Sequence, residues 1–201
     1  MIKNIVFDMG DVLMHFRTQD FVNRYDLTDD EKALLTDVVF GGADWALCDW
    51  GYLTEEQVAE RACKKLPEKL HEAAWGCAAH WFEPVIPVEG MADLVRRIKE
   101  AGYGLYLLSN AGHHHKDYWP HVPGSEYFDG VLASAYIKVV KPQPEIYHML
   151  FEKFSLDPKE CVFIDNSNIN LAGAALCGME TLHFTSAKKL LADLQALGIK
   201  L

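Results

Sequence analysis

The chain has 201 residues, of which 50% are apolar and 24% are charged. This length and composition allow one large domain with a real hydrophobic core, and they exclude a disordered tail or a small disulfide scaffold. Its 19 Lys and Arg against 29 Asp and Glu give a net charge of −10. A surface this negative repels phosphate backbones and anionic lipids, so we expect no nucleic-acid partner and no membrane partner.

The cysteines and the start of the chain indicate the compartment. The five cysteines form no CxxC pair and are odd in number, and the first residues run directly into a strand-like segment without a signal peptide. No apolar run approaches the roughly 18 residues that a bilayer crossing needs. The sequence therefore predicts a reducing, cytoplasmic location.

The first 87 residues combine one strand with a long helical segment. Ile5 to Phe7 form a short β-branched and aromatic run, which predicts a buried strand ending at Asp8. From about 17 to 87 the pattern is typical of helices. Two capping boxes, Thr28 to Glu31 and Thr54 to Gln57, each precede an apolar helical face. A further apolar stretch, Leu70 to Trp81, is bounded by two prolines.

From residue 88 onward, predicted strands and helices alternate. The strands are expected at 105–108, 131–133, 161–164 and 181–184, and the helices at 91–98, 143–154 and 168–177. This alternation predicts a parallel sheet covered by helices on both faces. We therefore expect an α/β fold in which residues 1–16 and 88–201 form the sheet domain and residues 17–87 form an inserted all-α bundle.

The insert holds four of the five tryptophans, at positions 45, 50, 75 and 81. Large aromatic side chains can stabilise the thin core of a small bundle. They can also form the inner face of a lid that contacts a ligand. Both interpretations stay open at this point.

Polar side chains follow the predicted strands at the points where they end. These are Asp8, the pair Ser109 and Asn110, Asp165, and Lys141 a little after the 131–133 strand. Ligands of open parallel sheets bind at the carboxyl ends of the strands. Taken alone, each residue could be a turn, a helix cap or a solvated side chain. Together, two carboxylates, a hydroxyl and an ammonium suit a divalent cation beside a phosphate group.

The order Asp8, Ser109, Lys141, Asp165 resembles the four motifs of the haloacid dehalogenase superfamily. The matching stretches are Ile5 to Leu13, Leu107 to Asn110, Lys141 to Tyr147, and Val162 to Ser167 with Asn170 and Ala174. The resemblance covers the whole sheet domain. It implies a Rossmann-like catalytic core, and it implies that the helical-bundle insert is the cap that this family places after its first strand.

The resemblance also implies a mechanism and a cofactor. Asp8 would attack phosphorus and form an aspartyl phosphate that water hydrolyses, with Lys141 as the second catalytic residue. Ser109, Asn110 and Lys141 would hold the phosphate. Mg²⁺ would be held by the carboxylates of Asp8 and Asp165 and by the backbone carbonyl of Gly10. The implied partner is a small phosphorylated substrate.

One position departs from the family pattern. Most phosphatases of this superfamily carry a second Asp where this chain has Gly10, and that Asp protonates the leaving group. Asp11 lies one residue later, so we expect its side chain to point elsewhere. A branch similar to bacterial α-D-glucose-1-phosphate phosphatases also carries Gly here, with Trp-Pro and Lys-Pro where this chain has Trp119-Pro120 and Lys141-Pro142. A sugar phosphate with a good leaving group is therefore the preferred substrate, unless a turn with positive φ requires the glycine.

Two other functions stay open. One is a metal-independent 2-haloacid dehalogenase, against which Asp165 argues because that chemistry has no cation for a second carboxylate to hold. The other is a catalytically weakened protein that binds a ligand or partner, which Gly10 and Asn166 keep open. The run His113 to His115 is not expected to form one metal site, because consecutive side chains point in different directions. A monomer and a homodimer are both compatible with the sequence.

Overall fold

A five-stranded parallel sheet forms the centre of the protein. The computed structural model describes residues 1–201 and gives the strand order β3-β2-β1-β4-β5. The strands are β1 (Asn4–Phe7), β2 (Gly104–Ser109), β3 (Gly130–Ala133), β4 (Cys161–Asp165) and β5 (Glu180–His183). Each lies within a residue or two of its predicted position, and every pair is parallel. The predicted α/β fold with a Rossmann-like sheet is confirmed.

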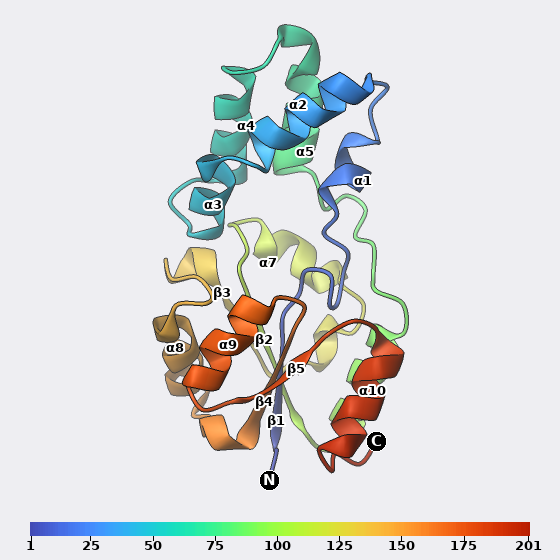
Figure 1. Ribbon diagram of the computed structural model, residues 1–201, viewed down its shortest axis with the longest axis vertical. Coiled ribbons are helices and arrows are strands. Elements are labelled where there is room, and N and C mark those ends of the chain that lie inside the picture. The colour runs from blue at the N-terminus through green and yellow to red at the C-terminus, as the bar shows by residue number, and fades with distance from the viewer.

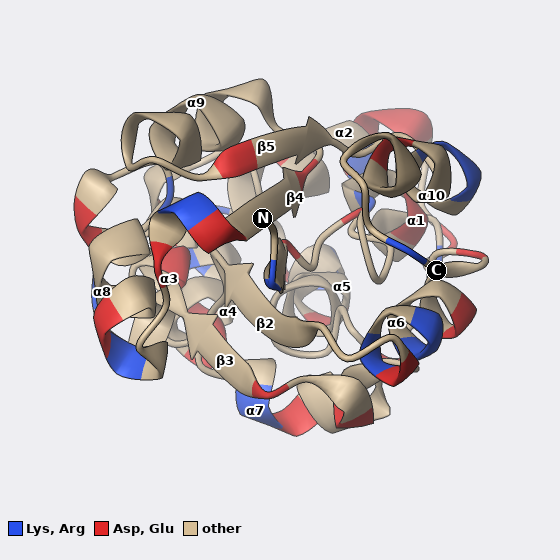
Figure 2. Ribbon diagram, turned by 90° about the horizontal axis from the view of Figure 1, so that it is seen from below, with Lys and Arg blue, Asp and Glu red and all other residues tan.

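Helices cover both faces of this sheet (Figure 2). On one side lie α8 (Pro144–Phe154) and α9 (Asn168–Leu176), and on the other lie α6 (Met91–Glu100) and α10 (Ala187–Ala196). Successive side chains of a strand point to opposite faces. Accordingly Ile5 and Phe7 belong to the apolar cluster that contains α6 and α10, whereas Val6 belongs to the cluster that contains α8 and α9. This two-sided burial explains why the strands read as continuous apolar runs.

Five helices of the insert lie together beyond the carboxyl ends of the strands (Figure 1). They are α1 (Thr18–Val22), α2 (Asp29–Val39), α3 (Ala43–Asp49), α4 (Glu55–Cys63) and α5 (His71–Ala79). Both predicted capping boxes are present, because Thr28 and Glu31 at α2, and Thr54 and Gln57 at α4, satisfy each other's backbone donors. The helical bundle expected between the first and second strands is confirmed.

Two chain segments connect this bundle to the sheet, and they run side by side. Met14 pairs with Pro87 in an antiparallel bridge, the His15 amide donates to Ile86 at 2.8 Å, and the amide of Val88 donates to Leu13 at 3.0 Å. We infer that this two-stranded connection divides the chain near residues 17 and 87, into a core and a cap. Those names are used for the two parts below.

Aromatic side chains fill the cap where it faces the core. Phe16, Phe21, Phe40, Trp45 and Trp81 pack on one another with ring centroids 4.8 to 6.1 Å apart. Phe16, Trp45 and Trp81 also line a cavity between cap and core. Trp45 and Trp81 therefore do both things expected of the tryptophans: they stabilise the bundle, and they form the inner face of a lid over the cavity.

The sequence patterns missed several short or weakly patterned elements. These are α1, α3, the four-residue α7 (His115–Tyr118), α10, and 3-10 turns at Glu68–Leu70, Trp119–His121, Ser125–Tyr127, Ser134–Tyr136 and Pro158–Glu160. Apart from the ten-residue α10, these elements have too few residues for a period to show. None of the helices combines the length and the apolar character that crossing a membrane requires.

Candidate active site

Two carboxylates and one ammonium meet at the carboxyl edge of the sheet. Asp8 directly follows β1, and Asp165 ends the neighbouring strand β4. Lys141 comes from the loop before α8, and its Nζ lies 2.6 Å from Asp8 Oδ1 and 2.8 Å from Asp165 Oδ2. The side chains of Lys141 and Asp165 are 1% and 0% exposed, and that of Asp8 is 12% exposed. Asp8 is therefore the more exposed of the two carboxylates.

Burial and neighbouring charges shift the proton affinities of these groups. Burial raises the pKa of Asp8, Lys141 opposes the rise, Asp165 adds to it, and the result is about 6. For Lys141, burial by itself lowers the pKa, but the two carboxylates outweigh it and the pKa lies above its ordinary value. At pH 7 the centre therefore holds an ammonium that stays charged between two carboxylates.

The partners of Asp165 fix its orientation. Its Oδ1 accepts a hydrogen bond from the Ser167 amide at 2.7 Å, and its Oδ2 accepts one from Asn170 Nδ2 at 3.0 Å in addition to Lys141. Asn170 belongs to the fourth of the matching stretches, and its side chain binds Asp165. It holds a buried carboxylate in one orientation, which a metal ligand requires.

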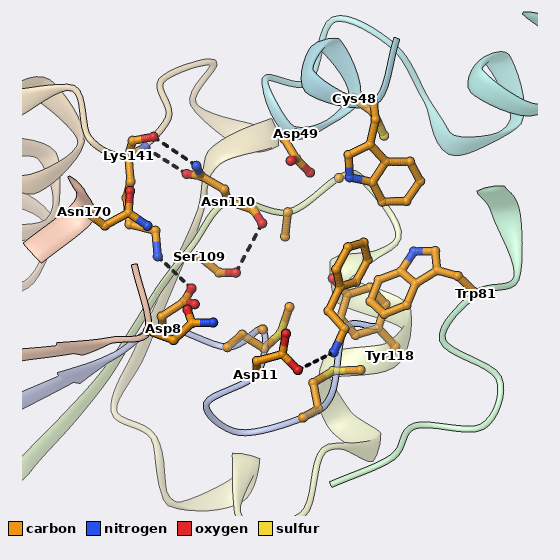
Figure 3. A pocket seen from close by; sticks show the side chains of 18 of the residues that line it. Asp8, Asp11, Cys48, Asp49, Trp81, Ser109, Asn110, Tyr118, Lys141 and Asn170 are labelled. Atoms are coloured by element: carbon orange, nitrogen blue, oxygen red, sulfur yellow. Dashed lines mark hydrogen bonds and ion pairs between the residues drawn. The ribbon is translucent and has the colours of Figure 1, made fainter. Parts of the chain in front are cut away.

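Ser109 and Asn110 lie at the end of β2, beside Asp8 (Figure 3). Ser109 is buried and lines the cavity. The Asn110 side chain makes two hydrogen bonds with the backbone of Lys141. Its Nδ2 donates to the Lys141 carbonyl at 3.0 Å, and its Oδ1 accepts from the Lys141 amide at 2.8 Å. Asn110 thus positions Lys141, a contact that its predicted phosphate-binding role did not include.

Gly10 and Asp11 form the turn after Asp8. The φ of Gly10 is not positive, and a Cβ at this position would meet only Phe16 Cβ, at 3.6 Å. The backbone therefore does not require glycine here. Asp11 adopts a φ of 54° and directs Oδ1 toward the Phe16 amide at 3.2 Å and His15 Nδ1 at 3.3 Å. Its Oδ1 thus binds the connection to the cap, but Asp11 also lines the cavity beside Asp8 (Figure 3), so its side chain is not turned away from the site as expected.

A cavity of about 230 Å³ lies above Asp8, between core and cap (Figure 3). Its floor is polar and contains Asp8, Ser109 and Lys141. Its opposite wall is aromatic, with Trp45 and Trp81 from the cap, Phe16 at the connection between core and cap, and Tyr118 from α7. A concave site with a few convergent polar groups and an apolar wall is the usual form of a small-molecule site.

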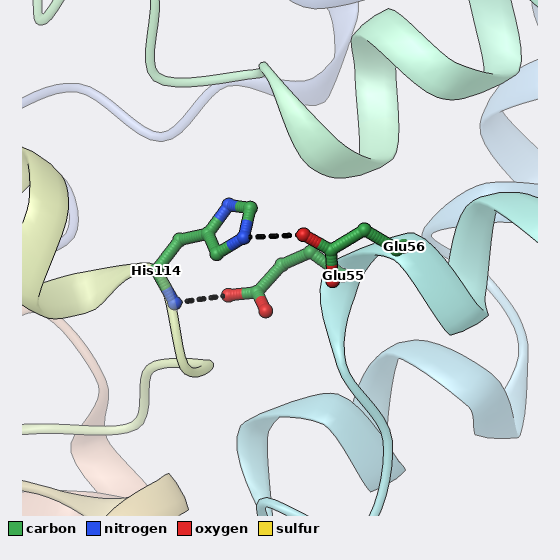
Figure 4. Close-up of side chains that lie close together, drawn as sticks. All are labelled: Glu55, Glu56 and His114. Atoms are coloured by element: carbon green, nitrogen blue, oxygen red, sulfur yellow. Dashed lines mark hydrogen bonds and ion pairs between the residues drawn. The ribbon is translucent and has the colours of Figure 1, made fainter.

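Acidic side chains of α4 hold the cap against the loop after β2 (Figure 4). The His114 amide donates to Glu55 Oε1 at 2.8 Å, and His114 Nε2 lies 2.7 Å from Glu56 Oε1. One potential metal-ligand atom of each residue lies within 4.8 Å of the others. Because both carboxylates already bind His114, we interpret this cluster as a contact between cap and core.

The three consecutive histidines point to three different partners. Nε2 of His113 lies 3.3 Å from the Gly51 carbonyl, and His114 binds the cap as described. His115 is buried and stacks on Trp119, and burial lowers its pKa to about 4. Their side chains diverge, as their spacing predicted.

Comparison with known proteins decides the family. A sequence profile described as haloacid dehalogenase-like hydrolase matches residues 2–178. The chain belongs to this family of hydrolases. The match includes all four strand-end positions, Asp8, Ser109, Lys141 and Asp165.

Other haloacid dehalogenase-like hydrolases share the complete fold. A HAD family enzyme from Bacteroides thetaiotaomicron is 25% identical with a TM-score of 0.72, and 99% of each chain is covered. The same enzyme, solved with magnesium and inorganic phosphate, gives 25% identity and a TM-score of 0.70 over 92% of this chain and 96% of that one. A predicted HAD-like hydrolase from Porphyromonas gingivalis has a TM-score of 0.76 over both whole chains at 21% identity, which shows the fold alone.

The curated relatives match only part of the chain. A sesquiterpene phosphatase from Aspergillus oryzae is 30% identical over 103 residues, which are 50% of this chain and 52% of that protein. A chloroplast flavin mononucleotide hydrolase from Arabidopsis thaliana is 27% identical over 112 residues, 56% of this chain and 46% of that protein. The chain thus spans about half the length of these two relatives.

Two acidic residues of the site were not predicted from the sequence. Asp49, the last residue of α3, and Glu55, in the first turn of α4, both line the cavity. Neither follows a strand or lies in a motif. Glu55 is the first residue after the Thr54 cap, so its acidity alone indicated a helix N-terminus.

Proposed function

We propose that this protein is a Mg²⁺-dependent phosphatase that hydrolyses a small phosphorylated metabolite through an aspartyl-phosphate intermediate. The observation that carries the proposal is the convergence of Asp8, Lys141 and Asp165 on the floor of a cavity closed by the cap. Of the two carboxylates, only Asp8 keeps exposure toward that cavity. A nucleophile needs this access, whereas a metal ligand and a charge-balancing ammonium can be buried.

Each residue then has a role that its position supports. Asp8 attacks phosphorus in line with the departing oxygen, and water later releases phosphate from the aspartyl group. Lys141 and Ser109 bind phosphoryl oxygens beside it, with Asn110 holding the Lys141 backbone. Lys141 also offsets the negative charge of both carboxylates, which would otherwise repel a phosphate dianion.

The groups around Asp8 fit a magnesium ion. Asp8, Asp165 and the Gly10 carbonyl offer only oxygen ligands, which a hard divalent cation prefers. The Gly10 carbonyl accepts no hydrogen bond from the protein, and Asn170 and Ser167 hold the Asp165 carboxylate in place. When bound, the ion would supply positive charge next to the transferring phosphoryl group. The Bacteroides enzyme, solved with magnesium and phosphate, supports this assignment.

The cavity indicates the substrate class. A phosphate on the polar floor would direct the rest of the molecule toward the aromatic wall of Phe16, Trp45 and Trp81. A volume of about 230 Å³ suits a small molecule with one ring or a short chain. A sugar phosphate meets both requirements, since aromatic rings pack well against the C–H faces of a sugar. Five free cysteines support the cytoplasm as its location.

A panel of phosphorylated metabolites tests this function. We expect phosphate release in the presence of Mg²⁺, none after addition of a chelator, and less than a few per cent of the wild-type rate in Asp8→Asn. The amide is nearly isosteric and cannot act as the nucleophile, so circular dichroism should show an unchanged fold.

The same assay separates the alternatives. Halide release from 2-haloacids that persists with chelator would establish a dehalogenase instead. Saturable binding of a phosphorylated ligand without turnover, in protein that also binds Mg²⁺, would establish a ligand-binding member of the family. Either result would overturn the proposal.

A further inference from the structure

Three carboxylates that line the cavity, Asp11, Asp49 and Glu55, have no part in the mechanism above. Asp11 accepts a hydrogen bond from the Phe16 amide and Glu55 accepts one from the His114 amide, which leaves Asp49. Asp49 ends α3 in the cap and lines the cavity together with Asp8 (Figure 3). It is half-buried, and its side chain forms no ion pair and no hydrogen bond with the protein. A carboxylate held in a substrate cavity without a partner is available to a ligand.

The backbone that carries Asp49 is attached to the core. Ser134 Oγ donates to the Asp49 carbonyl at 2.5 Å, and His113 Nε2 lies 3.3 Å from the carbonyl of Gly51. Gly51 has a φ of 75°, and a Cβ there would overlap the backbone of Ala135. Only glycine permits this close approach. The end of α3 is thus fixed against the same domain that carries Asp8.

The position of Asp49 suits the oxygen that leaves phosphorus. In an in-line displacement the attacking and departing oxygens lie on opposite sides of phosphorus. Asp8 attacks from the sheet, so the departing oxygen points toward the cap. Asp49 approaches from the cap, whereas Asp11 lines the cavity from the turn after Asp8 and accepts a hydrogen bond from the Phe16 amide.

The surroundings of Asp49 favour its protonated form. Burial raises its pKa, the charges of Glu55 and Asp8 raise it further, Lys141 opposes them, and the result is about 7. A general acid works best with a pKa near the working pH. The titratable and charged groups that face Asp49 from the elements around it are Cys48, Glu55, Asp8, Tyr118 and Lys141.

The other proton-bearing groups around Asp49 are poorer acids. Burial raises the pKa of Cys48, and burial together with nearby acids raises that of Tyr118 well above its ordinary value. Lys141 is committed to two carboxylates. Asp8 also has a pKa near neutrality, about 6, but it is the attacking group, so Asp49 remains as the acid for the departing oxygen.

We propose that Asp49 is the general acid and base of this enzyme, supplied by the cap in place of the acid that Gly10 lacks. This proposal rests on the proposed phosphatase function. In the first step the bond from Asp8 to phosphorus forms, the bond to the departing oxygen breaks, and the Asp49 carboxyl proton moves to that oxygen, so an alcohol leaves. In the second step water attacks phosphorus, its proton returns to the Asp49 carboxylate, and Asp8 is released together with phosphate.

This assignment changes the expected substrate range. Glycine at position 10 indicated an enzyme restricted to good leaving groups. With Asp49 as the acid, a sugar 6-phosphate that expels a primary alkoxide becomes a substrate as well as a sugar 1-phosphate. Wild-type protein should therefore hydrolyse both with similar kcat/KM.

Asp49→Asn tests the proposal with substrates of graded leaving group. We expect kcat/KM to fall about 10²- to 10⁴-fold for sugar phosphates and other alkyl phosphates. For 2,4-dinitrophenyl phosphate, whose leaving group needs no proton, kcat/KM should stay within a few fold of wild type. The matched control is Asp37→Asn, which removes an exposed acid from α2 of the same cap and should change neither value.

A second readout examines the other half of the reaction. Without the Asp49 carboxylate, water attacks the aspartyl phosphate more slowly, so dinitrophenyl phosphate should give a burst of dinitrophenolate followed by a slow steady state. An equal loss of kcat/KM for all leaving groups would show that Asp49 only shapes the cavity, and no loss would show that it has no catalytic part. Absence of phosphate release in wild type would instead refute the phosphatase function itself.

Discussion

Asp49→Asn should make the metal-free protein more stable at high pH, although it makes the enzyme slower. A carboxyl whose pKa is higher in the folded than in the unfolded chain favours folding only while it is protonated. For Asp49 the pKa rises from 3.8 to about 7. Its favourable contribution is complete below pH 3.8 and is lost as the pH rises through about 7. The asparagine is neutral throughout and avoids this loss.

The magnitude follows from the pKa. Between pH 5 and pH 8 the folded protein gives up a proton near pH 7, while the unfolded chain is already ionised at pH 5. Since pH 5 lies two units below the folded pKa, the protonated carboxyl adds at most about 2.7 kcal/mol to the free energy of unfolding at pH 5, at 1.36 kcal/mol per unit. This contribution is lost by pH 8. Because the half-buried carboxyl still contacts water in the cavity, we expect about 1 to 2 kcal/mol.

Urea denaturation of both proteins in chelator at pH 5, 6, 7 and 8 measures the effect. The difference in unfolding free energy, Asp49→Asn minus wild type, should increase by about 1 to 2 kcal/mol from pH 5 to pH 8. Taking the difference at each pH removes the contribution of His115, whose lowered pKa makes both proteins less stable as the pH falls. Asp37→Asn should show no such trend. A difference that is constant with pH would refute the placement of Asp49 in an electrostatically unfavourable site.

Two further substitutions examine the floor of the cavity. Lys141→Ala should destabilise the metal-free protein by roughly 3 to 5 kcal/mol, because two buried carboxylates lose their shared cation. Differential scanning fluorimetry should then show that Mg²⁺ stabilises this variant more than it stabilises wild type. Gly10→Asp should fold normally, because its Cβ has space and its φ is not positive, and in the Asp49→Asn background it should speed alkyl phosphate hydrolysis at least 10-fold.

Both substitutions have results that would contradict the reasoning. Unchanged stability and unchanged Mg²⁺ response in Lys141→Ala would show that the two carboxylates do not depend on Lys141. For Gly10→Asp the control is Mg²⁺ affinity measured by calorimetry, which should match that of wild type. A double variant that binds Mg²⁺ normally, and yet stays as slow as Asp49→Asn on alkyl phosphates, would show that position 10 cannot reach the departing oxygen.

Local patterns were sufficient to predict the sheet and the residues at its edge. The apolar runs at 5–7, 105–108 and 161–164 could be assigned to buried strands, because the side-chain period of a strand lies within a few neighbouring residues. Parallel strands bring their carboxyl ends to one edge, so Asp8, Ser109 and Asp165 had to lie together once the strands were adjacent. The capping boxes at Thr28 and Thr54 were equally local, since each involves residues three positions apart.

The contacts that complete the site were decided by tertiary structure. The side chain of Asn110 binds the backbone of Lys141, 31 residues away, and Ser134 binds the carbonyl of Asp49 across 85 residues. No local period or motif marks such pairs, because they depend on where a cap helix and a core loop meet. Sequence by itself therefore determined the fold and the positions of Asp8 and its charged neighbours. Packing of the cap against the core determined that a carboxylate from α3 faces them.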